Sequence, residues 1–150
     1  MIEDLENRPE QIQKLASWHL KEWPELAHQD RVDLIKPRSG KTLLPKTFMM
    51  VLDGGGWHEQ TAGFVSLDHK TLLAGRCESP WLTTLLVGPE FRGKGVGRSL
   101  VQFCCEYVKK IGYSTLYLHT TEAPDFYRKL GWEQYEYDDT AGRTFFRMKL

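Results

Sequence analysis

The segment from Trp81 to Gly97 constrains the fold of this chain more than any other. An apolar run, Trp81 to Val87, leads through a Gly-Pro turn into Arg92-Gly-Lys-Gly-Val-Gly97, and an amphipathic run follows over 98–111. The apolar run predicts a buried strand covered on both faces, and the amphipathic run predicts a helix. Glycines between such elements let backbone N–H groups approach an anion at the positive end of the helix dipole. We therefore expect a phosphate-bearing ligand at residues 92–98.

Three cations, Arg92, Lys94 and Arg98, lie within the seven residues 92–98. Cations beside accessible amides make an anion site, which a purely steric role for the glycines does not explain. Two familiar nucleotide motifs fit poorly. A P-loop needs a hydroxyl residue for magnesium where this chain has Gly95, and a dinucleotide fingerprint needs a third glycine where it has Arg98.

The composition points to one folded domain in a reducing compartment. The chain has 150 residues, with 20 basic and 20 acidic side chains, so it has no general attraction for nucleic acid. No apolar run approaches the roughly 18–20 residues of a membrane span, and the acidic N-terminus lacks a signal-peptide core. The cysteines, Cys77, Cys104 and Cys105, suit neither a disulfide framework nor a zinc cluster. We therefore expect a cytoplasmic protein with one domain over 1–150, no membrane partner and no metal.

Hydrophobic periodicity gives the element order β-α-α-β-β-β-α-β-α-β-β. The second half alternates strands and helices, which predicts parallel neighbours, and hairpins elsewhere predict antiparallel ones. The fold class is therefore α/β, in an α+β arrangement with a central mixed sheet flanked by helices. The expected strands are 2–6, 47–52, 61–67, 81–87, 114–119, 132–137 and 143–150, and the expected helices are 10–22, 28–36, 98–111 and 123–130.

Two motifs resemble those of the GNAT superfamily of N-acetyltransferases. Arg92 to Gly97 matches its Arg/Gln-x-x-Gly-x-Gly/Ala signature, and Phe126 to Trp132 is similar to its Phe-Tyr-x-x-x-Gly-Phe segment. The opening of the central strand, Pro80-Trp-Leu82, resembles that of small prokaryotic-type members. The resemblance implies the GNAT fold over nearly the whole chain.

The resemblance also implies that acetyl-CoA is the co-substrate. Its pyrophosphate would lie on the glycine loop, and its pantetheine arm would run beside the central strand as an added strand does. Many members have an asparagine near position 120 that contacts the arm. This chain has none, so Thr120 or Thr121 would replace it. The implied cofactor-binding residues are Leu85, Leu86, Val87, Arg92, Gly93, Lys94, Gly95, Val96, Gly97, Arg98, Thr120 and Tyr127.

The resemblance implies acyl transfer from a thioester to an amine, which needs a base and an acid. Tyr127 is the candidate acid for the leaving sulfur, with core packing as its alternative role. Glu78, just before the central strand, is the candidate base, and its alternative is a solvated loop residue. His119 is a second possible base or a satisfied histidine at a strand end. Trp81 and Glu78 are expected to line the acceptor site.

We therefore expect an acetyl-CoA-dependent N-acetyltransferase acting on a primary amine of a small molecule or peptide. The alternative is a CoA-binding sensor or partner module without catalysis. A monomer or a homodimer suits a domain of this size.

Overall fold

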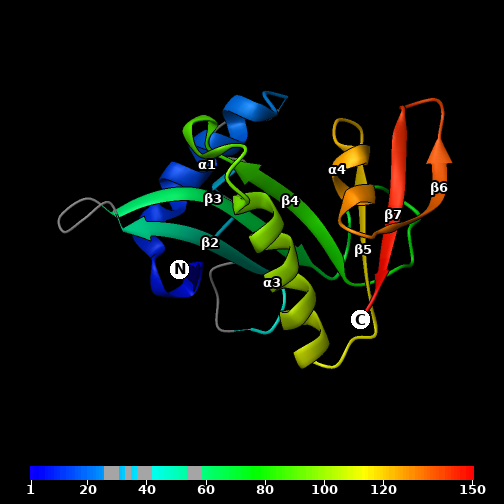
Figure 1. Cartoon of the computed structure of the whole chain (residues 1–150), viewed down its shortest axis with the longest axis horizontal. Helices are drawn as coiled ribbons and strands as arrows, with labels where there is room; N and C mark the ends of the chain where they lie inside the picture. Colours follow the sequence, from blue (N-terminus) through cyan, green and yellow to red (C-terminus); the bar gives the residue numbers. More distant parts are fainter. Residues whose placement is uncertain (26–30, 33–34, 37–41, 54–58) are drawn as a thin grey trace.

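The computed structural model describes residues 1–25, 31–32, 35–36, 42–53 and 59–150. Its centre is one seven-stranded sheet in the order β1-β2-β3-β4-β5-β7-β6 (Figure 1). All neighbouring pairs are antiparallel except β4 with β5, which is parallel. The strands are β1 (Ile2–Asp4), β2 (Lys46–Asp53), β3 (Glu59–Asp68), β4 (Trp81–Val87), β5 (Thr115–Thr120), β6 (Glu133–Asp138) and β7 (Arg143–Lys149).

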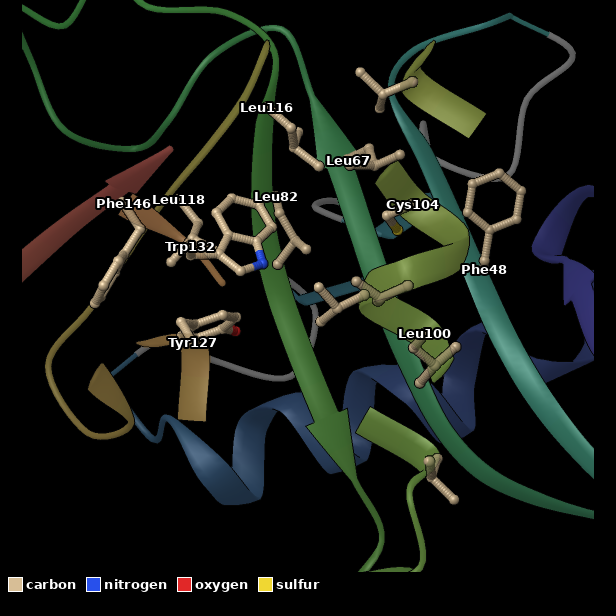
Figure 2. Packing of buried hydrophobic residues seen from close by; sticks show 14 of the residues in the cluster. Phe48, Leu67, Leu82, Leu100, Cys104, Leu116, Leu118, Tyr127, Trp132 and Phe146 are labelled. Atoms are coloured by element: carbon tan, nitrogen blue, oxygen red, sulfur yellow. The ribbon is translucent and has the colours of Figure 1, made fainter. Parts of the chain in front are cut away.

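Helices cover the sheet through two separate cores. Helix α3 (Val96–Lys110) buries an apolar stripe at helical spacing, including Leu100 and Cys104, against β3, β4 and β5 (Figure 2). The short helix α4 (Pro124–Lys129) adds Tyr127 to this core. A second core joins α1 (Ile12–Glu22) to side chains of β2, β3 and β4. Because β4 contributes to both cores, it is a strand with two buried faces, as the sequence predicts.

Strands β4 and β5 pair only at the start of β4 and then diverge. Their ladder contains the single pair Trp81↔Tyr117, with the Tyr117 N–H donating to the Pro80 carbonyl at 3.1 Å. On its other side β4 pairs with β3 along its whole length, but Thr83 has no partner in that register and forms a β-bulge. A bulge bends its strand and increases its twist. The bend explains why β4 diverges from β5, a divergence that Figure 1 shows plainly.

Most expected elements are confirmed, and the differences are local. Helix α3 begins at Val96, two residues before the expected start, since the left-handed Gly95 already ends the loop. Strand β7 lies between β5 and β6, so the parallel neighbours expected in the second half reduce to β4 and β5. The expected helix over 28–36 lies largely outside the described residues. Within the described residues, no helix is both long and apolar enough to span a membrane.

Candidate functional site

The first turn of α3 carries backbone donors without an intrahelical acceptor. The first amide of this helix that donates a backbone hydrogen bond to the preceding turn is that of Ser99, which donates to the Gly95 carbonyl at 3.0 Å. The amides of Val96, Gly97 and Arg98 precede it, and Gly95, in the N-cap position, has no side chain that could cap them. Gly95 adopts φ +82°, which a residue with a Cβ atom rarely does. The 15-residue helix thus presents a positive, uncapped N-terminus to a ligand.

A pocket of about 460 Å³ opens at this helix end. One wall is the outer part of β4, and the rest comes from the loop, the start of α3 and the residues just before and within α4. We call it the glycine-loop pocket. Its floor is apolar, and its mouth has two cations, Arg92 and Arg98, against one carboxylate, that of Glu22. This combination suits an apolar arm ending in phosphates. It is lined by Glu22, Leu85, Leu86, Val87, Phe91, Arg92, Gly93, Gly95, Val96, Gly97, Arg98, Ala123 and Phe126.

The edge of β4 that borders this pocket has unpaired backbone groups. The Gly88 N–H donates to the Ala62 carbonyl of β3 at 2.8 Å. Since bonding directions alternate along a strand, the backbone groups of Leu85 and Val87 point away from β3, toward the opening. The Val87 carbonyl accepts a bond from Arg92 Nε at 3.1 Å, which agrees with this direction. An extended ligand can therefore pair with β4 as an added strand does.

A second pocket, of about 360 Å³, begins where the first one ends along β4. It is lined by Thr83 and Thr84 of β4, by the end of β5 and the residues after it, and by residues at and beyond the end of α1. We call it the threonine pocket. Both pockets extend from β4 to the chain that follows β5, so they meet the same opening in the sheet. The remaining lining residues are His19, Trp23, Glu25, Arg31, Leu72, His119, Thr120, Thr121, Glu122 and Arg143.

His119 is the titratable ring of the threonine pocket. Its Nε2 lies 2.8 Å from Thr71 Oγ1, and its ring packs against Trp81 and Phe145. Burial, together with the nearby charges of Arg143 and Arg76, lowers the pKa of His119 to about 4. The imidazole is therefore neutral at pH 7 and has a nitrogen lone pair that can accept a proton.

Tyr127 lies behind the glycine-loop pocket in the α3 core. Its ring packs edge to face with Phe126 at 5.0 Å and with Trp132 at 5.9 Å, and only 6% of the residue is exposed. Figure 2 shows its hydroxyl directed toward β4. Burial raises the pKa of the hydroxyl, and the neighbouring Cys104 adds to the rise. Tyr127 therefore keeps its proton through the neutral range.

Glu78 belongs to an ion-pair network before β4. Its Oε2 accepts from Arg76 Nε at 3.0 Å and from the Tyr135 hydroxyl at 3.2 Å. Arg76 also binds Glu136 at 2.6 Å and stacks over the Phe145 ring at 4.1 Å. Glu78 lines neither the threonine pocket nor the glycine-loop pocket. Its carboxylate thus has a structural role that the sequence did not predict.

The other predicted residues divide between the two pockets and their supports. Trp81 is fully buried, donates from Nε1 to the Glu78 carbonyl at 2.5 Å and packs against the His119 ring. It lines neither pocket. Lys94 extends its Nζ over the Phe91 ring, 5.9 Å from the centroid. Thr120 lines the threonine pocket, and its Oγ1 accepts from the Ala123 N–H at 3.1 Å.

Sequence reasoning missed the two arginines of the threonine pocket, Arg31 and Arg143. They are 112 residues apart along the chain (143 − 31), and neither lies in a motif. The strand–turn–strand pattern at 132–150 predicts Arg143 at the start of a strand. That pattern does not predict that Arg143 lines a pocket together with residues of β4. Within the described residues, no cluster of His, Cys, Asp and Glu side chains could hold a metal ion.

Comparison with known proteins gives a family and a fold. Residues 46–134 match the model of the acetyltransferase (GNAT) domain, and no curated protein sequence matches the chain. An aminoglycoside 6'-N-acetyltransferase complexed with coenzyme A is similar in structure, with TM-score 0.79 and 17% identity over 99% of this chain and 96% of that one. A ribosomal-protein-alanine N-acetyltransferase from Brucella melitensis gives TM-score 0.75 and 16% identity over 100% and 99%. The protein yncA from Salmonella typhimurium, solved with its cofactor acetyl-CoA, gives 0.72 and 14% over 100% and 93%.

We predict that His119 makes the fold sensitive to acid. Its pKa is about 4 in the folded chain against ~6.5 when unfolded, so between these values the unfolded chain binds a proton that the folded chain does not. Stability should therefore fall as the pH falls through this window. His119→Gln should lose less stability than the wild type between about pH 6.5 and about pH 4, measured by urea unfolding. The exposed His69→Gln control should follow the wild type. Parallel losses in the wild type and His119→Gln would contradict the prediction.

Proposed function

The chain belongs to the GNAT acetyltransferase family, and we propose that it transfers the acetyl group of acetyl-CoA to a primary amine. The observation that carries the proposal is the meeting of an uncapped helix N-terminus and an unpaired strand edge in one pocket. An elongated ligand with phosphates at one end and amide groups along its arm complements both features. Acetyl-CoA has this form and supplies an activated thioester.

The residues of the glycine-loop pocket fit such a ligand. The amides of Val96, Gly97 and Arg98 are free to bind phosphate oxygens, and Gly93 and Gly95 keep Cβ atoms away from them. Arg92, Lys94 and Arg98 would add charge at the mouth. The backbone of Leu85 and Val87 would pair with the arm, while the side chains of Leu86 and its neighbours keep β4 in the core.

The threonine pocket is the proposed acceptor site. It touches β4 at Thr83 and Thr84, next to the residues that would hold the arm, so an amine there would face the thioester end. The amine must attack as the free base, although a lysine amine has a pKa of ~10.4 and an α-amine ~8. A backbone N–H on the open edge of β4 can stabilise negative charge that develops on the acyl oxygen.

Two groups can take the amine proton. His119 lines the threonine pocket, and this placement favours it. With a pKa of about 4 it is a weaker base than the amine, so it would accept the proton as the nitrogen bonds to the acyl carbon and becomes more acidic. Glu78, the base expected from the resemblance, pairs with Arg76 at 2.9 Å and would have to act through an intervening water. Tyr127 is the proposed acid for the leaving sulfur, because it holds its proton and its hydroxyl faces β4.

A CoA-binding module without catalysis remains the second candidate function. Such a module needs the glycine-loop pocket but no proton-transfer groups. Acetyl-CoA binding measured by calorimetry, without acetyl transfer to any member of a broad amine panel, would favour it over the transferase.

We predict that the two ends of α3 respond differently to substitution. Gly95 and Gly112 both have positive φ, +82° and +106°, and a Cβ atom at either would meet nothing within 4 Å. Gly95→Val and Gly112→Val should therefore lose similar stability, at least ~1–2 kcal/mol each. Only Gly95→Val should weaken CoA binding, by about a hundredfold or more in calorimetry. Equal CoA affinity in both variants would remove the phosphate site from the loop.

We predict that Tyr127→Phe affects turnover and spares binding. Loss of a positioned general acid should lower kcat by ~10²–10⁴-fold. The Kd for acetyl-CoA should stay within about threefold, a change of under ~0.7 kcal/mol. The exposed Tyr137→Phe is the matched control and should keep wild-type turnover. Wild-type turnover in Tyr127→Phe would show that another group, or solvent, protonates the sulfur.

We predict that the pH profile distinguishes the two bases. His119→Gln should lower kcat/KM by ~10²–10⁴-fold and move the ascending limb to higher pH, since the amine then has to deprotonate in solvent. Glu78→Gln should lower stability through Arg76 and leave the shape of the profile unchanged. The reverse pattern, with a shifted profile only in Glu78→Gln, would identify Glu78 as the base.

A further inference from the structure

Arg31 is a buried cation whose charge is poorly balanced by the described residues. Its side chain is only 2% exposed. Its guanidinium contacts His19 Nδ1 and donates to the Trp23 carbonyl, and neither partner is anionic. Among the described residues, one carboxylate comes as near as 4.0 Å, that of Glu25, whose side chain is 77% exposed. A guanidinium is always charged, and removing one from water is costly unless an anion accompanies it.

Arg143 approaches the same pocket from the far side. It opens β7, and its neighbour Thr144 pairs with Thr120 at the end of β5. Its Nη1 lies 3.7 Å from Asp138 Oδ2, longer than a hydrogen bond. The Nε atoms of both Arg31 and Arg143 are buried and have no hydrogen-bond partner among the described residues. Both side chains line the threonine pocket, and each guanidinium thus has an unused N–H donor in a largely desolvated setting.

The charges of the threonine pocket are arranged by depth. The carboxylates of Glu25 and Glu122 belong to exposed residues, whereas Arg31 is buried and Arg143 is largely so. The interior is therefore cationic and the rim is anionic. A polycationic amine would bring its charges toward Arg31, which is unfavourable in a site of low dielectric.

We propose that the acceptor is an amine that also carries a carboxylate, of amino-acid size, and that Arg31 and Arg143 bind this carboxylate. The proposal rests on the proposed function, because it names the acceptor class of that same site. A carboxylate accepts N–H donors in charge-assisted bonds, and it would add a counter-charge beside Arg31. The pocket, at about 360 Å³, holds a molecule of this size.

The test compares amino acids with their own carboxamides as acceptors. A panel that includes glycine, alanine, phenylalanine, lysine and glutamate is assayed, each as the acid and as the amide, with acetyl-CoA at saturation. The measured quantity is the ratio of kcat/KM for the acid to that for the amide, in the wild type and in variants. The two amines of a pair differ in pKa, but this difference cancels when one pair is compared across enzymes.

We expect Arg143→Gln to lower the acid-to-amide ratio at least about tenfold for the best acceptor pair, the effect of losing a charged hydrogen bond. Arg31→Gln should do the same if it folds, as judged by thermal unfolding. Arg147→Gln, on the same strand but paired with Glu133 at the surface, should leave the ratio unchanged. An unchanged ratio in Arg143→Gln, or a wild-type preference for amides and polyamines over every acid, would overturn the proposal.

Binding without turnover separates this proposal from the proposed function. N-acetylphenylalanine and its carboxamide are titrated into the wild type and Arg143→Gln by calorimetry. Selective, Arg143-dependent binding of the acid would support the carboxylate site even if no amine is acetylated. Acetylation of amines with equal binding of acid and amide would keep the transferase and refute the carboxylate site.

Discussion

The site depends on the separation of two parallel strands in the middle of the sheet. Backbone groups in the interior of a sheet are almost always paired, because an unpaired buried group is costly. Here β4 and β5 share one register pair and then diverge at the bulge of Thr83. The backbone groups of Leu85 and Val87 face an opening with a pocket on either side of it, and the Val87 carbonyl there accepts from Arg92 Nε. The rest of the fold keeps this opening from closing.

Two cores hold the strands apart while they stabilise the sheet. Leu86 of β4 packs in the α1 core, whereas Leu82 of β4 and Leu118 of β5 pack in the α3 core. At the base of the opening, where β4 and β5 still pair, Trp81 is fully buried and its ring packs on Tyr117 of β5. The ion pairs of Arg76 with Glu78 and Glu136 connect this base to β6. The base of the opening is therefore held by buried packing and ion pairs, which suits a ligand that pairs with a strand edge.

The chain has no net charge, but positive charge is concentrated at its two pockets. Because acidic and basic residues are equal in number, the net charge of the chain gives it no attraction for polyanions. Yet the mouth of the glycine-loop pocket has Arg92 and Arg98, and the interior of the threonine pocket has Arg31 and Arg143. Both ligands that we propose, a pyrophosphate-containing thioester and a carboxylate-bearing amine, are therefore matched by local charge and not by net charge.

The sequence predicts what local pattern determines and misses what distant contacts determine. Strand β4 and the stripe of α3 follow from apolar periodicity, and the glycine loop follows from the conformations that only glycine readily adopts. The insertion of β7 between β5 and β6 depends on pairing across the chain, which periodicity does not report. Likewise, Glu78 is held by Tyr135, 57 residues away, so its engagement could not be inferred from its loop.

Residue-resolved amide hydrogen exchange, with and without CoA, tests the central claim most directly. If CoA pairs with the open edge of β4 and with the first turn of α3, the amides of Leu85, Val87, Val96, Gly97 and Arg98 should exchange more slowly in its presence. The amide of Gly88, already bonded to Ala62, should change little. Protection confined to other segments, or CoA binding without protection of these five amides, would contradict the account.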